Sequence, residues 1–381
     1  MKTAISQSWV DSLIRPQCRG FEPYLPGRSI ESVRRERGLK QLYKLASNEN
    51  ALGPSPRALK AVATLGKSIL RYPDGASTAL RQALAKKNGV ASEQVIIGAG
   101  SDELIELLGK TFLNPGDSIV VSDHAFIRYK MAGELMGATV LTVPMREMTH
   151  DLGMMLEAIR SDTKIVFIAN PNNPTGTYNT QEELEELLEH TERLRQRGQS
   201  VLVVVDEAYY EFASALERTY PRTLELQQSY SNLVILRTFS KVYALAGLRV
   251  GYGFADPGVI AALDRVRPPF NVSTVAQAAA EASLQDRAQV SRGVRLVQEG
   301  RKQVLPALEQ MGLRVIPSVG NFTLVDVSPH RGAEVFDTLL DRGVIVRAMD
   351  EYGFPQHIRV TYGLPVENRW FLKAMKEVLA T

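Results

Sequence analysis

The sequence VLVVVDEAYY, residues 201–210, joins five apolar residues directly to two carboxylates and two tyrosines. An apolar run without alternation is typical of a strand in a parallel sheet that helices cover on both faces. Six similar runs alternate with amphipathic segments: VIIG (95–98), DSIVVS (117–122), ATVLTV (138–143), KIVFIAN (164–170), NLVILRTFSK (232–241) and RVGYG (249–253). The alternation predicts an α/β fold with a mostly parallel, seven-stranded sheet between helices.

The composition excludes several classes of protein. The 381 residues are 44% hydrophobic and 23% charged, which is enough for a substantial core. The 45 Lys and Arg and 42 Asp and Glu are spread along the chain, so a nucleic-acid partner is disfavoured. No stretch approaches the roughly 18 to 20 apolar residues of a membrane span, so we expect a cytoplasmic protein without a membrane partner. A single cysteine, Cys18, and five scattered histidines predict neither a disulfide framework nor a metal site.

The pattern changes after about Pro269, where we expect a second, smaller domain. A long amphipathic helix is predicted over 274–310, followed by a compact αβ unit. Thr180 and Glu183 predict a capping box at the start of a helix over 180–197. The predicted organisation has three parts: an N-terminal arm (1–45) that packs with the small domain, a large domain (46–270) and a small C-terminal domain (271–381).

Polar clusters follow four of the expected strands: GAGSDE (98–103), NPNNPTG (170–176), DEAY (206–209) and TFSK (238–241), the last with Arg249 close behind. Taken singly, they could be ordinary turns, a structural salt bridge at Asp206 and a surface Lys241. However, parallel strands present their carboxyl ends at the same end of a sheet, where α/β proteins bind ligands. Glu103 stands where a dinucleotide-binding fingerprint needs its third glycine, so a nicotinamide-dependent dehydrogenase is disfavoured.

An anion cradle, a buried carboxylate, a phenol and a lysine at one end of a sheet suit pyridoxal 5'-phosphate. Its aldehyde needs a lysine, its pyridine nitrogen needs a carboxylate, and its phosphate needs amides, hydroxyls and an arginine. The four clusters contain each of these groups. The sequence therefore predicts a pyridoxal-phosphate site.

These segments also carry a family resemblance. The sequences 170–176, 206–209, 240–241 and 246–249 together resemble the signature of class II aminotransferases of fold type I, which depend on pyridoxal phosphate. Further segments are similar to the histidinol-phosphate aminotransferase family: PYLPG (23–27), ASNEN (46–50), LGPSP (52–56), RYPD (71–74) and HIRVT (357–361). The likeness runs from about Gly20 to the C-terminus.

The resemblance implies catalytic roles for three residues. Lys241 would hold the cofactor covalently and later move a proton between the substrate Cα and the cofactor. Asp206 would pair with the pyridinium N–H, and Tyr209 would bind the ring hydroxyl together with Asn173.

The remaining implied cofactor contacts concern the phosphate and the ring face. Phe126 would stack on the ring at a place where the family often has tyrosine; this costs stacking little but removes one hydroxyl. The neighbouring His124 is expected to be an ordinary loop histidine. The implied phosphate ligands are the backbone N–H groups of Ser101 and Asp102, the side chains of Ser240 and Arg249, and Tyr72 of the partner subunit in a homodimer with shared sites.

The implied substrate contacts are Tyr24, Asn48, Tyr72, Arg347 and Arg359. The family resemblance implies an amino donor and a 2-oxo acid acceptor, namely L-histidinol phosphate and 2-oxoglutarate, which give imidazole acetol phosphate and L-glutamate in histidine biosynthesis. Arginine binds carboxylates and phosphates alike, so two alternatives stay open on the same fold. These are an aromatic amino acid aminotransferase and a threonine-phosphate decarboxylase.

Overall fold

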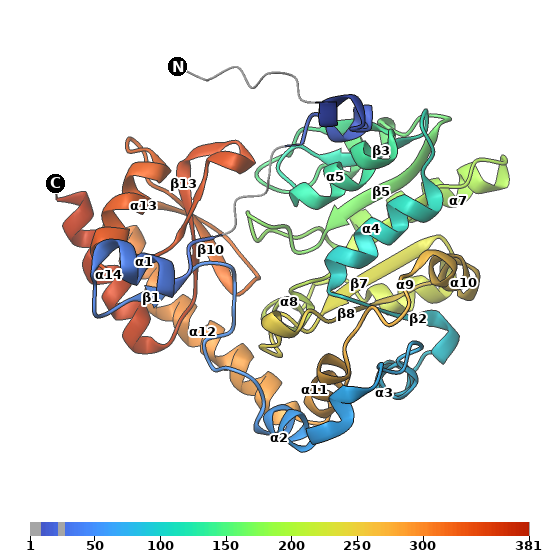
Figure 1. The fold of residues 1–381 in the computed structure, drawn as a ribbon. Helices are drawn as coiled ribbons and strands as arrows, with labels where there is room; N and C mark the ends of the chain where they lie inside the picture. Colours follow the sequence, from blue (N-terminus) through green and yellow to red (C-terminus); the bar gives the residue numbers. More distant parts are fainter. Residues whose placement is uncertain (1–8, 22–26, 381) are drawn as a thin grey trace.

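The computed structural model describes residues 9–21 and 27–380 and contains a seven-stranded sheet between two layers of helices (Figure 1). The strands lie in the order β2-β8-β7-β6-β5-β3-β4, and only β8 is antiparallel to its neighbours. All seven predicted strands and the mostly parallel sheet are therefore confirmed. Their bounds are β2 Val95–Gly98, β3 Ser118–Ser122, β4 Thr139–Val143, β5 Thr163–Ala169, β6 Leu202–Asp206, β7 Leu233–Thr238 and β8 Gly251–Phe254.

Both faces of this sheet are buried, as the unbroken apolar runs predict, except at the edge strand β4, where Thr139 and Thr142 are exposed. In β6, Val203 and Val205 point into one apolar cluster, while Val204 points into the other. The first cluster includes α3 Thr78–Asn88, α6 Leu152–Glu157, α7 Gln181–Gln196, α8 Tyr210–Leu216 and α9 Thr223–Ser229. The second includes α4 Ser101–Phe112, α5 Ile127–Met136 and α10 Pro257–Val266.

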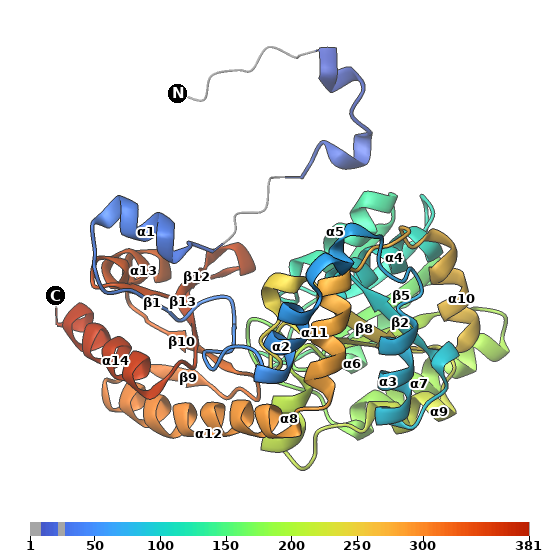
Figure 2. The same cartoon turned by 60° about the horizontal axis from the view of Figure 1, so that its bottom comes forward.

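A smaller antiparallel sheet with the order β12-β13-β10-β9 is formed by the C-terminal part of the chain, coloured orange to red in Figure 1. Its strands are β9 Arg314–Ile316, β10 Phe322–Asp326, β12 Arg347–Met349 and β13 Phe354–Thr361. Helices α12 Arg287–Gln310, α13 Gly332–Asp341 and α14 Pro365–Leu379 accompany it (Figure 2).

The N-terminal segment contacts both parts of the molecule. Helix α1 Ile30–Arg37 packs Val33 in one apolar cluster with Leu340 and Ile345, and β1 Tyr43–Lys44 pairs in parallel with β11 Val344–Ile345. Before that, Arg15 donates from Nη2 to the carbonyl of Leu135 in α5 at 3.0 Å. The exact domain boundaries stay a prediction.

The expected single helix over 274–310 is wrong, because the chain breaks at Gln285 and Asp286 into α11 Thr274–Leu284 and α12. The carboxylate of Asp286 caps α12 by accepting the amide of Gln289 at 3.0 Å, and it also accepts the hydroxyl of Ser55 at 2.5 Å. An aspartate that caps a new helix in this way satisfies amides that a continuous helix would bond to carbonyls. The capping box of Thr180 and Glu183 is present.

The remaining elements are short. They are α2 Pro56–Thr64 and the 3₁₀ turns Trp9–Ser12, Pro16–Cys18, Gly66–Leu70, Ser92–Gln94, Ala246–Leu248 and Asp350–Tyr352. Among the described residues, no helix combines the length and apolar character needed to cross a membrane.

Candidate active site

A cavity of about 480 Å³ lies where β5, β6 and β7 end and α4 begins. Its walls contain nine of the ten residues that the sequence assigned to the cofactor: Ser101, Asp102, Phe126, Asn173, Asp206, Tyr209, Ser240, Lys241 and Arg249. They come from segments up to about 150 residues apart, so the carboxyl ends of the strands do bring the four polar clusters together.

Asp206, the last residue of β6, is 5% exposed. Its carboxylate accepts the hydroxyl of Tyr129 at 2.9 Å and the amide of Ala208 at 3.1 Å. Burial raises the pKa of Asp206 to about 6, although these two hydrogen bonds act in the opposite direction. Among residues 9–21 and 27–380, no lysine or arginine forms a salt bridge with it. A buried carboxylate without a cation suits a charged N–H donor such as a pyridinium.

The neighbouring Glu207 is a buried carboxylate that does have a cationic partner. It is fully buried, but Arg237 donates to it from both Nε and Nη2 at 2.8 Å, and Thr223 and Tyr220 donate to its other oxygen. Glu207 therefore belongs to a structural ion pair, while Asp206 faces the cavity with two neutral donors.

Lys241 follows β7 and reaches into the same cavity. Its Nζ donates to the carbonyl of Ser47 at 3.1 Å and lies 5.5 Å from the centre of the Tyr209 ring. Burial, followed by the positive charges of Arg359 and Arg249, lowers the pKa of Lys241 to about 7. A large share of this amine is therefore neutral near pH 7, which makes it a nucleophile for a carbonyl group.

Arg249 and the start of α4 form the anion-binding end of the cavity. A Cβ on Gly100, whose φ is +86°, would lie 2.6 Å from Nη2 of Arg249, so the guanidinium approaches the loop where only glycine leaves room. The same guanidinium donates to the carbonyl of Ala246 at 3.0 Å and to the hydroxyl of Ser240 at 3.5 Å. A helix N-terminus, a hydroxyl and an arginine together suit a phosphate.

Tyr129 is a site residue that the sequence analysis missed. Besides its bond to Asp206, its ring stacks on Phe167 at a centroid distance of 5.1 Å, and Phe126 meets its ring edge at 5.8 Å. Tyr129 lies in the first turn of α5, three residues after the N-cap residue Phe126. That spacing was the available signal, but the bond to Asp206 spans 77 residues and leaves no local pattern.

A second cavity of about 160 Å³ adjoins the first, since Phe126, Asn173, Tyr209 and Lys241 line both. Arg359 of β13 donates through Nη1 to Asn173 Oδ1, and its guanidinium lies 5.5 Å from the ring of Phe322. The Nε of Arg359 is buried and has no hydrogen-bond partner in the described part of the chain. An unsatisfied buried cationic donor is costly, so this arginine suits an anionic ligand.

Two other residues of the second cavity have partners of their own. Arg347 of β12 pairs with Glu351 in the 3₁₀ turn that follows the strand, with Nε 3.2 Å from the carboxylate. Asn48, 1% exposed, donates from Nδ2 to the hydroxyl of Tyr209 at 2.8 Å. Burial raises the pKa of Tyr209, so its own hydroxyl proton remains available for donation. Asn48 thus orients Tyr209.

Two further residues of the sequence analysis, Tyr72 and His124, lie outside these two cavities. Tyr72 is 82% exposed and stacks on Phe270 at 4.7 Å, and it lines neither cavity. Tyr24 falls outside the described residues. His124 has its Nδ1 2.6 Å from the carbonyl oxygen of Tyr352 and packs on Phe354, as expected for a satisfied loop histidine. Among the described residues, no group of three or more His, Cys, Asp or Glu side chains could hold a metal ion.

The chain is similar in sequence and in fold to proteins of a known family. Residues 40–372 match the model of aminotransferase class I and II. The histidinol-phosphate aminotransferase of Moorella thermoacetica is 46% identical over 96% of this chain and 94% of its own length, and that of an Anaeromyxobacter species is 45% identical over 96% and 99%. The crystal structure of the Sinorhizobium meliloti histidinol-phosphate aminotransferase in complex with pyridoxal-5'-phosphate matches with a TM-score of 0.84 and 28% identity, over 95% of this chain and 98% of that one. The chain therefore belongs to the class I and II aminotransferases, within the histidinol-phosphate aminotransferase family.

Proposed function

We propose that this protein binds pyridoxal 5'-phosphate on Lys241 and transfers an amino group between L-histidinol phosphate and 2-oxoglutarate, a step of histidine biosynthesis. The proposal depends on two groups in one cavity: Asp206, a buried carboxylate that forms no salt bridge among the described residues, and Lys241, a partly buried lysine of lowered pKa. Perturbed pairs of this kind are typical of catalytic sites.

The residues present fit this cofactor. When bound, pyridoxal phosphate supplies an aldehyde for the amino group and an electron-accepting ring that stabilises negative charge at the substrate Cα. Arg249, Ser240 and the amides of Ser101 and Asp102 would hold the phosphate, since they form the anion-binding end of the cavity. Phe126 would cover one face of the ring.

Asp206, Tyr209 and Lys241 would each have a separate role in the reaction. Asp206 would hold the pyridinium N–H and stay ionised because that positive charge replaces the missing cation. Tyr209, oriented by Asn48, would donate its hydroxyl proton to the ring oxygen, with Asn173 beside it. Lys241 would take the proton from the substrate Cα, because an amine with a pKa about 7 is well matched to proton transfer near neutral pH.

The phosphate of the substrate would bind in the second cavity. Arg359 offers a buried guanidinium whose Nε has no partner in the described part of the chain, and Arg347 lies at the same cavity. A phosphate ester has more acceptor oxygens and more charge than a carboxylate, so two guanidinium groups favour it. The names of the relatives at 43–46% identity support the same donor.

We further infer a homodimer in which Tyr72 reaches the phosphate site of the second copy. Supporting this, the segment around Tyr72 exposes large apolar side chains: Leu70 is 86% exposed, Ile69 66% and Phe270 44%. Exposed apolar groups that lie close together are typical of a contact with another chain.

The test is a comparison of kcat/KM for L-histidinol phosphate, phenylalanine, tyrosine and threonine phosphate with the purified holoenzyme. We expect a yellow protein whose visible band is lost on borohydride reduction, with the label on Lys241, and a preference for histidinol phosphate. An aromatic amino acid that wins by more than about tenfold, roughly 1.4 kcal/mol of transition-state preference, would replace the proposed donor. Release of carbon dioxide from threonine phosphate would replace the reaction.

A further inference from the structure

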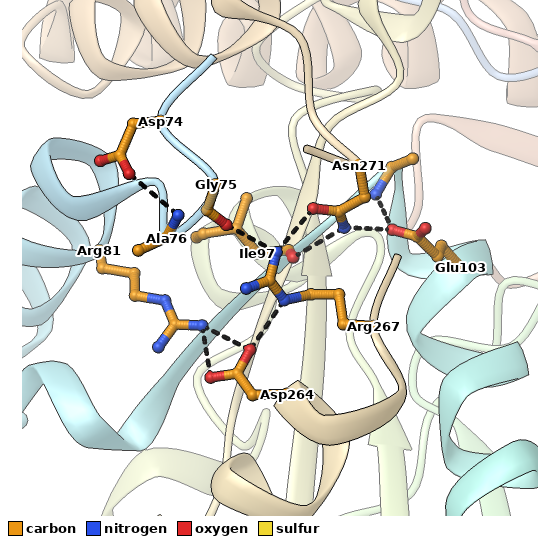
Figure 3. A network of polar contacts seen from close by, with 10 residues as sticks. Asp74, Gly75, Ala76, Arg81, Ile97, Glu103, Asp264, Arg267 and Asn271 are labelled. Atoms are coloured by element: carbon orange, nitrogen blue, oxygen red, sulfur yellow. Dashed lines mark hydrogen bonds and ion pairs between the residues drawn. The ribbon is translucent and has the colours of Figure 1, made fainter. Parts of the chain in front are cut away.

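A network of polar contacts connects the loop before α4 with the segment that carries Tyr72 (Figure 3). It begins at Glu103, whose Oε2 accepts the amide of Ala99 at 2.6 Å and the Nδ2 of Asn271 at 2.6 Å. Ala99 belongs to the turn that leads into Ser101 and Asp102. The carboxylate therefore holds the turn whose following amides face the cavity.

Asn271 extends the network away from the cavity. Its Nδ2 also donates to the carbonyl of Ile97 at 3.3 Å, while its Oδ1 accepts from Nη1 of Arg267 at 2.8 Å. That same Nη1 donates to the carbonyl of Gly75 at 2.8 Å, three residues after Tyr72.

The far end of the network is an ion-pair cluster. Asp264 accepts Nε of Arg267 at 2.7 Å and, with both oxygens, Nη2 of Arg81 at 2.9 Å. Figure 3 shows Arg267 between Asp264 and Asn271, so its guanidinium is restrained from both sides. A guanidinium held in this way has little freedom to release the Gly75 carbonyl.

Phe270 adds a second contact between the same two regions. Its ring lies 4.7 Å from that of Tyr72 with an interplanar angle of 18°, and its φ is +58°. A bulky residue in the left-handed region is costly, and it persists only where its surroundings hold it. Residues 270 and 271 thus contact the Tyr72 segment and the turn before α4 at once.

We propose that Glu103, Asn271 and Arg267 are positioning residues that fix the turn before α4 and the Tyr72 segment relative to each other. Each copy of the chain would thus hold in a fixed relation its two contributions, the turn to its own phosphate site and Tyr72 to that of the second copy. This rests on the proposed function, because it takes the phosphate of pyridoxal phosphate as the ligand. None of the three residues lines the cavity. Their effect is therefore exerted through the backbone of residues 99–102 and 72–75.

Replacing Glu103 gives the sharpest test. A purely electrostatic effect and a positioning role predict opposite changes in the affinity for pyridoxal phosphate. Removing a carboxylate near a phosphate site should tighten phosphate binding if only charge matters. Under the proposal, Glu103→Ala weakens pyridoxal phosphate binding at least about tenfold, because the carboxylate that accepts from both Ala99 and Asn271 is lost. Glu103→Gln keeps an acceptor for Ala99 and restores affinity to within about threefold of the unchanged protein.

The readout is the dissociation constant of the cofactor from the apoenzyme, followed by absorbance, for pyridoxal phosphate and for pyridoxal, which lacks the phosphate. The loss in Glu103→Ala and Asn271→Ala should be confined to the phosphorylated form. Asn232→Ala is the matched control: its Nδ2 also makes two hydrogen bonds, to Thr191 and Val201, but Asn232 precedes β7 and so lies at the opposite end of that strand from Ser240. It should lower the melting temperature without changing the ratio of the two constants.

Coupling to Tyr72 is measured by a double-mutant cycle with Arg267→Gln and Tyr72→Phe. We expect the loss caused by Arg267→Gln to shrink to less than about half in the Tyr72→Phe background, because the residue it positions has already lost its hydroxyl. Tighter binding by Glu103→Ala, an equal loss for pyridoxal, or additive effects in the cycle would overturn the proposal. If the unchanged protein binds no pyridoxal phosphate, the proposed function itself fails. Should Glu103→Ala not fold, Asn271→Ala and the cycle still decide.

Discussion

Replacing Asp206 by asparagine is expected to stabilise the cofactor-free protein while removing most of its turnover. The carboxylate is 5% exposed and forms no salt bridge among the described residues, so its charge is held in place at a cost to folding. Asparagine has nearly the same shape and can still accept the amide of Ala208. It cannot keep a pyridinium charged, so the electron-accepting ring of the cofactor is weakened.

The magnitude follows from the pKa of Asp206. Burial raises this pKa from 3.8 to about 6, and each unit corresponds to about 1.4 kcal/mol, so ionised Asp206 costs about 3 kcal/mol of folding free energy. This pKa already includes the hydrogen bonds that the carboxylate accepts from Tyr129 and Ala208. The expected gain of Asp206→Asn is therefore about 3 kcal/mol at a pH well above 6.

The difference in folding stability between the wild-type protein and Asp206→Asn also depends on pH. The folded-state pKa lies above the unfolded-state value, so the wild-type protein takes up a proton between pH 6 and pH 4 and loses the penalty there. The advantage of asparagine should be largest above pH 6 and should vanish by about pH 4.

The assay is urea unfolding of the two apoenzymes at pH 8, 6 and 4, with Glu207→Gln as the control. Glu207 is the next residue and is also buried, but its charge is paired with Arg237, so neutralising it should destabilise the protein. Pyridoxal phosphate should stabilise wild type more than Asp206→Asn. Equal stability at pH 8, a difference independent of pH, or stabilisation by Glu207→Gln would refute the reasoning.

Tyr129→Phe removes a hydrogen bond that lowers the pKa of Asp206, so that pKa should rise further and turnover near pH 7 should fall about tenfold; an unchanged pH profile of kcat would contradict this. The rate at which the apoenzyme incorporates pyridoxal phosphate should rise with pH around a midpoint of about 7, where Lys241 loses its proton, and a midpoint near 10.5 would show an ordinary lysine. Mixing Tyr72→Phe with Lys241→Ala subunits should restore about a quarter of the wild-type sites in a shared-site dimer, and no recovery despite verified subunit exchange counts against sharing. Arg359→Lys should lower kcat/KM for histidinol phosphate at least about tenfold through KM, because lysine lacks the fork of donors; equal kinetics would remove Arg359 from substrate binding.

The sequence alone determined the strands of the large sheet and the residues at their carboxyl ends. Burial on both faces imposes an unbroken apolar run, and this signal is local, so β5, β6 and β7 could be read from residues 163–238 directly. The positions of Asp206 and Lys241 followed from the same signal, because each comes at or just after the end of such a run. Periodicity failed at Asp286, where one capping side chain ends a helix that its apolar pattern would continue.

Only the tertiary structure decided how the site is held. Tyr129 bonds Asp206 across 77 residues, Asn48 bonds Tyr209 across 161, and Glu103 bonds Asn271 across 168. Such pairs leave no spacing in the chain, since their partners meet through the packing of separate elements against the sheet. The tertiary structure also decides which of the two carboxylates, Asp206 or Glu207, has an arginine partner. They are adjacent buried carboxylates in the sequence, but alternate side chains of a strand point to opposite faces, and only one of these faces holds Arg237.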